Sequence, residues 1–503
     1  MASLKEYRLE QLDKLAKLRK LGIDPYPAQA IQDSDLINIH KNFNQVQGQT
    51  YWLAGRLMTI RQHGKITFLD LKDQSGHLQL IVRSENLTSA QLNKQQFRYE
   101  DLQLLTRGDF INVYGRITKS QRGEISLEVE ILKLLCKVLR PLPLHLEDIE
   151  TCRRRRYLDL AINPEVQKRF IRRSIFWQST RDFLNQHNFF EINLPVLEHT
   201  TGGAEAKPFT THMDALNEDF YLRISHELPL KKLLSGGYER IYDIGPRFRN
   251  EHHSDEHLPE HVAMEFYWAY KDWQDGMEFT ENLIRYVVEK TFGTLEFSIG
   301  DFNINLKGAW SRHDYSDLMR KHYDIDVFQI GLKDLRSFLK SLNIQVEKID
   351  NLSSCIDKLF KNIRTGLAGP FWLVNIPAFM SPLAKLDDSN SNLSQRFQAI
   401  IGGTEVANGF SELNDPIDQL KRMEKQQALR QAGNQEAQML DIDFIEMLEY
   451  GMPPACGLGY SERLFWLLEG VMARDGVPFP HLKHEISQPT QEIYPNLYLR
   501  NKI

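Results

Sequence analysis

Five short segments between residues 50 and 137 limit most strongly what this chain can fold into. Apolar and polar residues alternate along them and glycines separate them, as in strands joined by tight turns. The segments are TYWLAGRLMTIR, ITFLDLKD, LQLIVRS, DFINVYGRITKS and EISLEVEILKLL. Five such strands suit a small closed Greek-key barrel, a fold whose strand faces and loops bind single-stranded nucleic acid.

A proline-containing linker and a basic helix flank these strands. RPLPLHLED, residues 140–148, excludes a helix and predicts a domain boundary. Residues 3–21 have leucines near helical spacing and more basic than acidic side chains, which predicts an amphipathic helix that either packs on the protein or contributes to polyanion binding. Beyond the linker, helical and strand-like pieces follow without regular alternation, which indicates an α+β domain. We therefore expect three parts, 1–48, 49–140 and 141–503.

Composition excludes several classes of protein. The net charge of -5 repels phosphate, so any nucleic acid must bind to local basic patches. No run approaches the ~18 apolar residues of a membrane span, and the charged N-terminus does not match a signal peptide, so we expect no membrane segment. The four cysteines lie far apart and form no Cys-x-x-Cys pair, which predicts a protein of the reducing cytoplasm.

Phosphate binding, if present, must come from arginines. The chain has neither a Gly-x-x-x-x-Gly-Lys-Ser/Thr loop nor a Gly-x-Gly-x-x-Gly turn. As a strand, YERIYDIGPRFRNE places Arg247, Arg249 and Glu251 on one side, and a guanidinium can grip two phosphate oxygens. HVAMEFYWAY then predicts the returning strand, on which Glu265 and Tyr267 share a face typical of a polar pocket wall.

Two later segments also place polar groups among apolar ones. In GGTEVANGFSELND, one strand face carries Asn408, Phe410 and Glu412. Glu405 has the opposite parity, so a common site requires an irregularity, for which Gly409 is the obvious place. In GLGYSERLFWLLEGVM, Arg463 stands at a predicted helix start, where it opposes the helix dipole and fits anion binding better than stability.

A zinc site is a rival interpretation of one loop. His253, Glu256 and His257 match the His-x-x-Glu-His pattern in which a helix brings two imidazoles to one metal. Pro259 and the strand-like flanks argue against that helix, so non-catalytic loop histidines are the simpler interpretation.

The order of the segments resembles one enzyme class. PEVQKRFIRRSIFWQSTRDFLNQHNFFEINLPVL, FRNEHHSDEHLPEHVAMEFYWAY and GLGYSERLF are similar to motifs 1, 2 and 3 of class II aminoacyl-tRNA synthetases. TGGAEAKPF, YLRISHELPLKKLLSGGYERIYDIGPRFRNE, NGFSELNDPIDQ, AGRLMTIRQHGK and RRRYLDL resemble the lysine-specific members. The resemblance covers nearly the whole chain. It implies an N-terminal OB-fold barrel that binds the anticodon, followed by an antiparallel-sheet catalytic domain flanked by helices, with motif 1 at a homodimer interface.

The resemblance also implies an activity and a set of site residues. The protein would use ATP to convert L-lysine to lysyl-adenylate and would transfer the lysyl group to the 3′-terminal hydroxyl of its tRNA. ATP would be bound by Arg249, Glu251, His257, His261, Glu405 and Arg463, of which Arg249 and Arg463 would be catalytic. Lysine would be bound by Gly203, Glu227, Glu265, Tyr267, Asn408, Phe410 and Glu412. The anticodon would contact Phe68, Gln79 and Glu124, although the strand pattern alone favours a core position for Phe68.

Three positions depart from the family pattern. Gln398 replaces the second of two carboxylates for ATP-bound magnesium, the first of which matches Glu405. Glu256 replaces an arginine of the motif 2 loop, and His261 replaces a phenylalanine that stacks on adenine. An amide oxygen can still ligate magnesium and an imidazole can stack, so the metal stoichiometry and the ATP affinity are more affected than the activity.

Other substrates and roles stay open. The reaction requires no general base, because the lysine carboxylate is already ionised. An aspartyl- or asparaginyl-type enzyme would share the barrel and the motifs, but would need a cationic or amide-reading pocket in place of Glu227, Glu265 and Glu412. A paralogue that lysylates a protein or only binds RNA is an alternative of another class.

Overall fold

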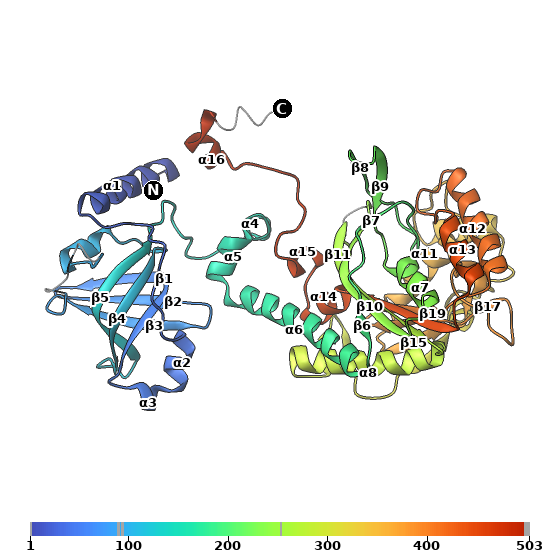
Figure 1. The fold of residues 1–503 in the computed structure, drawn as a ribbon, viewed down its shortest axis with the longest axis horizontal. Coiled ribbons are helices and arrows are strands. Elements are labelled where there is room, and N and C mark those ends of the chain that lie inside the picture. Colours follow the sequence, from blue (N-terminus) through green and yellow to red (C-terminus); the bar gives the residue numbers. More distant parts are fainter. Residues whose placement is uncertain (1–2, 88–90, 92–94, 252–253, 497–503) are drawn as a thin grey trace. The chain divides into compact units, whose positions relative to one another are not determined.

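The computed structural model describes residues 3–87, 91, 95–251 and 254–496, and these divide into two compact units (Figure 1). The first unit holds the residues up to 147 and those from 483 on, and the second holds 148–482. The boundary lies at the end of the predicted linker, whose residues 140–147 form no helix or strand. The segment from 483 joins the first unit because it packs on its first helix, where the Arg8 guanidinium carbon lies 5.5 Å from the Tyr494 ring centroid.

The first unit is the closed five-stranded barrel that the sequence predicts. Its strands are β1 (Thr50–His63), β2 (Ile66–Lys72), β3 (His77–Arg83), β4 (Phe110–Lys119) and β5 (Ile125–Cys136), in the order β1-β2-β3-β5-β4. Its helices are α1 (Leu4–Lys20), α2 (Leu36–Lys41), α3 (Phe43–Val46), a 3-10 helix (Tyr99–Leu104) and α16 (Gln488–Ile493). Alternate strand residues such as Leu69, Leu71 and Leu80 fill the barrel with apolar side chains.

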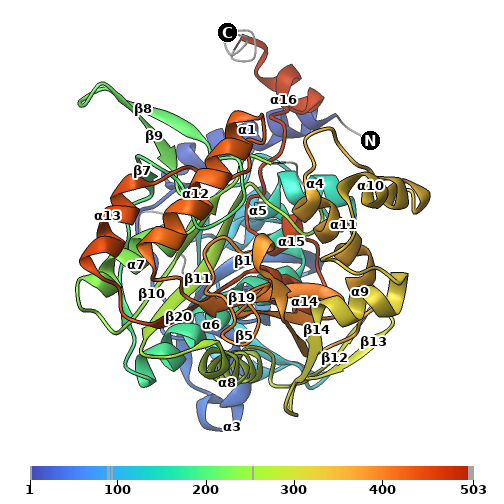
Figure 2. The same ribbon diagram turned by 90° about the vertical axis from the view of Figure 1, so that its right-hand side faces the viewer.

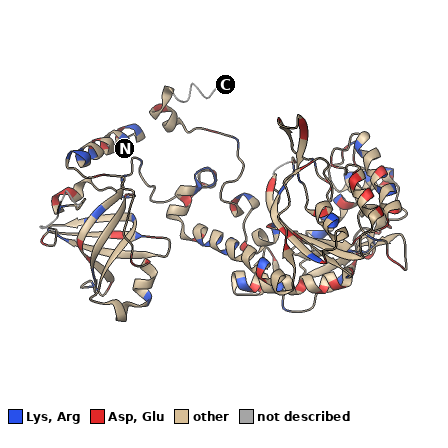
Figure 3. Ribbon diagram, viewed as in Figure 1, with Lys and Arg blue, Asp and Glu red and all other residues tan. Residues whose placement is uncertain are grey.

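The N-terminal basic helix is confirmed as α1. Ser3 caps it, accepting a hydrogen bond from the Glu6 N–H at 3.2 Å, while the Glu6 carboxylate accepts one from the Ser3 N–H. Leu15 and Leu18 are buried, and the basic side chains spread along the helix (Figure 3). The buried leucines show that the helix packs on the protein, which is one of the two roles predicted for it.

An eight-stranded sheet forms the centre of the second unit. Its order is β14-β15-β18-β19-β20-β11-β10-β6, with antiparallel pairs everywhere except β14–β15 and β10–β6. The strands are β6 (Phe190–Glu191), β10 (Arg240–Phe248), β11 (Glu260–Ala269), β14 (Ser311–Asp314), β15 (Phe371–Val374), β18 (Arg396–Ile401), β19 (Thr404–Ser411) and β20 (Ala455–Ser461). Smaller sheets pair β7 (Leu197–Glu198), β9 (Glu218–Leu222) and β8 (Thr210–Met213); β12 (Glu296–Ile299) and β13 (Phe302–Asn305); β16 (Ile376–Pro377) and β17 (Leu393–Ser394).

Helices cover both faces of this sheet (Figures 1 and 2). The helices α6 (Pro164–Gln186) and α8 (Trp273–Phe292) pack on one face, which carries Met264 and Phe266 of β11. The helices α7 (Glu227–Ser235) and α13 (Ile442–Tyr450) pack on the other face, near Tyr267. The remaining helices are α4 (Ile149–Arg154), α5 (Arg156–Ile162), α9 (Tyr315–Tyr323), α10 (Leu332–Ser341), α11 (Leu352–Arg364), a 3-10 helix (Ala378–Met380), α12 (Pro416–Gln431), α14 (Arg463–Glu469) and α15 (Ala473–Gly476).

Strand details bear out one expectation and correct two others. β11 is the predicted returning strand, and its residues alternate between the two faces as expected. β10 ends at Phe248, so Arg249 lies beyond the paired strand and strand parity does not place it. In β19 the irregularity is at Val406 rather than Gly409, because Ala399 pairs with Ala407 while Ile400 pairs with Glu405. The extra residue brings Glu405 to the face of Asn408.

Candidate active site

Glu265 is buried in the middle of the sheet and has several partners. Its Oε1 accepts hydrogen bonds from Ser225 Oγ at 2.8 Å and from the His226 N–H at 3.1 Å, and it pairs with Arg247 Nη2 at 2.9 Å. The Tyr267 hydroxyl donates to Oε2 at 3.1 Å. Burial opposes ionisation of Glu265, but Arg247, His226 and these hydrogen bonds outweigh it and lower the pKa to about 2. The face predicted to be a polar pocket wall therefore carries a fixed negative charge.

Lys231 lies between two further carboxylates of this pocket. Helix α7 begins at Glu227 and places Lys231 one turn later, with its ammonium 2.6 Å from Glu227 Oε1 and paired with Glu412. The ammonium also lies 5.1 Å from the ring centroid of Phe410. Burial alone would lower the pKa of Lys231, but Glu227 and Glu412 raise it, so the side chain stays charged. The carboxylates that the resemblance assigns to a substrate ammonium already hold an ammonium of the protein.

The pocket nevertheless contains more buried carboxyl groups than cations paired with them. Its buried carboxylates are Glu227, Glu265 and Glu412, and the cations paired with them are Lys231 and Arg247. Burial raises the pKa of Glu227 and of Glu412, with Lys231 opposing the rise. With all these groups ionised, the cluster carries one more carboxylate than cation. A ligand with one net positive charge, such as zwitterionic lysine, would balance it.

Two glycines permit this crowding. Gly457 pairs with both Tyr267 and Phe410 across the sheet, and a Cβ there would collide with the Glu412 carboxylate and the Tyr267 ring. Gly203 has φ +83°, and a Cβ there would lie 2.6 Å from Glu227 Cβ. Each position therefore excludes any larger residue.

Two arginines follow the C-terminal ends of β10 and β20, which lie on either side of β11 at the same edge of the sheet. Arg463 begins α14, as predicted, with Nη2 2.6 Å from His257 Nε2 and Nη1 donating to the Glu405 carbonyl oxygen at 3.3 Å. Arg249 follows β10, and its N–H donates to the Pro259 carbonyl oxygen at 2.8 Å. Among the described residues, neither buried Nε has a hydrogen-bond partner. Two incompletely satisfied guanidiniums provide an anion site.

The titratable groups at these strand ends experience a strongly positive field. Burial, with repulsion from Arg247, lowers the pKa of Arg249 to about 10. Burial and then Arg463 lower the pKa of His257 to about 4, and burial and then Arg249 lower that of His261 well below its usual range. Both imidazoles are therefore neutral at pH 7. His257 Nε2 accepts from Arg463, which leaves the Nδ1 hydrogen to bond Ser254 Oγ at 2.8 Å.

The hairpin of β18 and β19 carries the magnesium candidates. Gln398 faces Asn408 across the pair and is 8% exposed, while the Glu405 carboxylate is partly exposed. Arg396 Nε donates to Asn408 Oδ1 at 2.9 Å and fixes that amide. One carboxylate and one amide oxygen, completed by phosphate oxygens and water, are ligands that magnesium accepts. Gln398 and Glu405 therefore fit the expected metal through their oxygen atoms.

The zinc interpretation gains no support. Within the described part of the chain, no group of three or more His, Cys, Asp or Glu side chains is arranged to hold a metal. Residues 254–259 form a loop instead of the helix that the motif requires, and His253 lies outside the described residues. His257 has a different role there, as a partner of Arg463.

The three anticodon candidates lie on the barrel of the first unit. Gln79 Nε2 donates to Glu124 Oε2 at 2.7 Å. Phe68 alternates with the buried Thr67 and Leu69, so it points away from the interior and is half-buried. It lies outside the apolar cluster that fills the barrel. The core position that the strand pattern favoured for Phe68 is therefore wrong, because its parity places it on the outer face.

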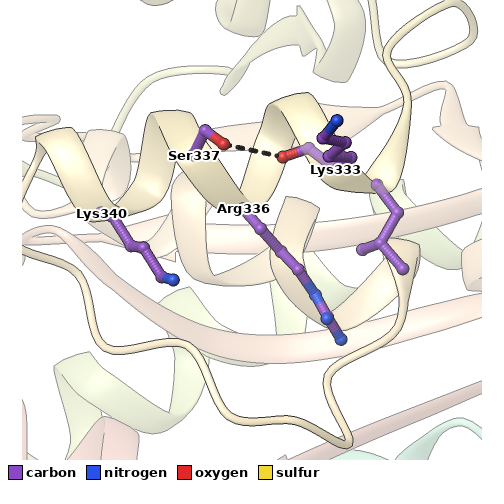
Figure 4. Close-up of a pocket in the computed structure, with 5 residues that line it drawn as sticks. Lys333, Arg336, Ser337 and Lys340 are labelled. Atoms are coloured by element: carbon purple, nitrogen blue, oxygen red, sulfur yellow. Dashed lines mark hydrogen bonds between the residues drawn. The ribbon is translucent and has the colours of Figure 1, made fainter.

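A separate surface hollow on α10 does not belong to this site (Figure 4). It is lined by Leu332, Lys333, Arg336, Ser337 and Lys340. The Arg336 guanidinium donates to the carbonyl oxygens of Lys348 at 3.0 Å and Asp350 at 2.6 Å, so it holds a neighbouring loop. Arg336, the central basic side chain of the hollow, therefore has a structural role.

Comparison with known proteins identifies the family. The model of class II tRNA synthetases for D, K and N matches residues 148–483, and that of the OB-fold nucleic acid binding domain matches 51–135. The chain is 40% identical to the lysine–tRNA ligase of Moorella thermoacetica, over 94% of this chain and 97% of the relative. It is 41% identical to that of Carboxydothermus hydrogenoformans, over 94% and 97%, and 38% identical to that of Thermotoga maritima, over 95% and 96%. The chain belongs to the lysine–tRNA ligase family of class II tRNA synthetases.

The structure adds three residues to the site that the family resemblance did not bring into it. Lys231 follows Glu227 by four residues, and this helical spacing in HELPLKK was a usable signal. Gly457 opens the motif 3 segment, and no local pattern indicated its contact with Glu412 and Tyr267. Arg364 Nη1 lies 3.8 Å from Glu405 Oε2, and no sequence signal indicated it, because it belongs to a helix outside the three motifs. Among the described residues, no helix is long and apolar enough to cross a membrane.

Proposed function

We propose that lysine and ATP react in the pocket formed by Glu265, Lys231 and the two arginines Arg249 and Arg463. Like its family, the chain activates L-lysine with ATP and transfers it to tRNA. One observation carries the site assignment. Buried carboxylates exceed their paired cations around Tyr267, while unpartnered guanidinium nitrogens lie at the adjoining strand ends. This separation of charge suits an amino acid with two ammonium groups next to a polyphosphate.

Each residue has a defined part in binding lysine. Glu412 beside Phe410, and Glu265 beside Tyr267, pair a carboxylate with an aromatic wall and suit the distal ammonium and the apolar stem. Glu227 and Gly203 suit the α-amino end, and Arg396 fixes the amide of Asn408. Lys231 keeps the side chains of Glu227 and Glu412 in place before lysine arrives.

The chemistry follows from this placement. The ionised lysine carboxylate attacks the α-phosphorus in line while the bond to the β-phosphate oxygen breaks, so lysyl-adenylate and pyrophosphate form and no base is needed. Arg249 stabilises the negative charge that grows on the α-phosphate, while Arg463 and neutral His257 bind the outer phosphates. Glu251 and His261 suit the adenine. Magnesium, held by Glu405 and Gln398, would neutralise phosphate charge when bound. The 3′-terminal hydroxyl of tRNA then attacks the carbonyl carbon of the adenylate, loses its proton and displaces AMP, which leaves lysine esterified to the tRNA.

Pyrophosphate exchange tests the substrate. We expect exchange with lysine alone among the proteinogenic amino acids, and no transfer of lysine to a protein in place of tRNA. Exchange driven by aspartate or asparagine would overturn the lysine assignment and support the alternative substrates. RNA binding without any exchange would support a binding paralogue.

The barrel is the proposed anticodon site, through Phe68, Gln79 and Glu124. Stacking on an aromatic ring is worth ~1 to 3 kcal/mol per base, so Phe68→Ala should lower tRNA charging roughly 5- to 100-fold and leave lysine-dependent exchange unchanged. Leu69→Ala, which truncates a buried neighbour, is the matched control for loss of packing. Equal losses of charging and exchange in Phe68→Ala would contradict the assignment.

We also propose a homodimer formed through motif 1. Helix α6 exposes Ile171 and Ile175 one turn apart, at 41% and 38%, and Phe190 next to it is 64% exposed. Such an apolar stripe is typical of an interface. Sedimentation should give a dimer that Ile171→Glu dissociates, whereas a monomeric wild-type protein would exclude it. A cytoplasmic location agrees with the four cysteines, none of which forms a disulfide bond among the described residues.

A further inference from the structure

The C-terminal end of α11 is fixed to the hairpin that carries Glu405. The N–H groups of Gly402 and Gly403, in the turn between β18 and β19, donate to the carbonyl oxygens of Ala368 at 2.6 Å and Leu367 at 2.9 Å. Both glycines have positive φ, +55° and +71°, and a Cβ on Gly403 would lie 3.1 Å from the Thr365 carbonyl oxygen. These contacts set the distance between the last turn of α11 and the phosphate end of the site.

Arg364 ends α11 and is buried beside Glu405. It is 7% exposed, its Nη1 lies 3.8 Å from Glu405 Oε2, and its buried Nε has no hydrogen-bond partner among the described residues. A single loose ion pair does not satisfy a buried guanidinium. A basic last turn does complement the helix dipole, but that effect favours exposed cations and leaves the buried, incompletely bonded Arg364 unexplained.

Lys361 lies one turn earlier on the same helix. It pairs with Asp357 at 2.8 Å, and its side chain is 59% exposed, so the ammonium is free to move toward a ligand. After burial, the charges that lower the pKa of His257 are those of Arg463, Lys361, Arg249 and Arg364. Four cations, two of them from α11, therefore act on one imidazole.

We propose that Arg364 and Lys361 bind the outer phosphates of ATP together with Arg463, and hold the pyrophosphate that leaves. The inference rests on the proposed function and extends it to a part of the chain outside the three motifs. The triphosphate supplies the oxygens that the Arg364 Nε and the Arg463 Nε lack. It also relieves the repulsion between these cations, and Arg364 brings positive charge beside Glu405.

Binding of inorganic pyrophosphate tests this directly. In calorimetry with EDTA present, we expect Arg364→Met to raise the pyrophosphate Kd at least about tenfold and Lys361→Met about threefold, because charged hydrogen bonds are lost. The lysine Kd should stay unchanged in both variants. Lys358→Met is the matched control, since Lys358 lies on the same helix but pairs with Asp350 at 2.5 Å; it should bind like wild type.

The outcomes separate the inference from the proposed function. Arg364→Lys should keep most of the pyrophosphate affinity if charge matters, and it provides the test should Arg364→Met fail to fold. Unchanged pyrophosphate Kd in Arg364→Met and Lys361→Met would overturn the inference, as would equal losses of pyrophosphate and lysine binding. A wild-type protein that shows no lysine-dependent exchange would overturn the proposed function and leave pyrophosphate binding as a separate result.

Discussion

The lysine pocket and the phosphate end of the site differ in how their buried charges are satisfied. In the lysine pocket, Glu265 pairs with Arg247, while Glu227 and Glu412 share Lys231. At the phosphate end, Arg249 and Arg463 have no ion-pair partner among the described residues, and Arg364 has only Glu405, at 3.8 Å. One region is internally paired, and the other has positive charge that only a ligand can satisfy.

This difference follows from the two ligands. Lysine brings one net positive charge, and a pocket of three unpaired buried carboxylates would be too costly to form without internal cations. ATP brings several negative charges, so the protein can leave its arginines partly unsatisfied and recover that cost when the triphosphate binds. The comparison predicts that substitutions at the phosphate end abolish chemistry, whereas those in the lysine pocket change affinity and stability.

The largest effect is expected at Arg249. Arg249→Ala removes a cation that stabilises transition-state charge, and exchange should fall by at least about 100- to 1000-fold. The thermal midpoint should stay within a few degrees of wild type, because the lost group has few partners to leave unpaired. Arg320→Ala, on the exposed surface of α9, is the control. An active Arg249→Ala protein would contradict the motif 2 assignment.

The next effect is on lysine affinity. Loss of one partner in a desolvated charge pair costs ~2 to 5 kcal/mol, so Glu412→Gln should raise the KM for lysine by tens of fold or more. The KM for ATP should change little. Glu446→Gln, exposed on α13, serves as the control. If Glu412→Gln and Glu265→Gln both retain wild-type lysine affinity, the pocket assignment fails although the family stands.

Lys231→Met tests whether the cation shared by Glu227 and Glu412 stabilises the folded lysine pocket. Removing the shared cation of a buried cluster costs ~3 to 5 kcal/mol of unfolding free energy. The pKa values of Glu227 and Glu412, already raised by burial, should rise further. Carboxyls with pKa values raised in the folded state stabilise it only while protonated, so the deficit should grow between about pH 5 and pH 9.

Denaturant titrations of wild type and Lys231→Met across this range measure that deficit. Lys232→Met is the control, because Lys232 lies on the same helix but is more exposed and pairs with Asp441 at the longer distance of 3.7 Å. A deficit that shrinks as the pH rises would mean that Lys231 is not the cation that keeps these carboxylates ionised.

The sequence predicted elements better than contacts. The barrel strands and the α14 start at Arg463 followed from alternation and a helix-start signal. The sequence predicted an irregularity in this strand but placed it at Gly409 instead of Val406. Parity shows that an extra residue is needed, but it does not show where the pairing shifts. The outer position of Phe68 was missed because apolar character outweighed parity.

The internal cations were the hardest features to predict. The position of Lys231 depends on Glu412, which is distant in the sequence and reaches it only through the sheet. Arg364 reaches Glu405 because α11 docks on two glycines of a hairpin turn, a contact that no local pattern encodes. Charge compensation of this kind is a property of the assembled sheet.

The smallest expected effect concerns Gln398. It tests how much of the phosphate charge is neutralised by protein cations instead of by magnesium. Gln398→Glu adds a carboxylate beside Glu405, which should lower the magnesium concentration for half-maximal exchange about threefold to tenfold, because magnesium affinity rises with ligand charge. Calorimetry of magnesium binding to the ATP-bound protein should show the same shift. Gln431→Glu, at the exposed end of α12, controls for net charge. Indistinguishable magnesium titrations of Gln398→Glu and wild type would mean that Gln398 is not a ligand, and that Arg364 beside Glu405 already supplies the charge that a second carboxylate would recruit.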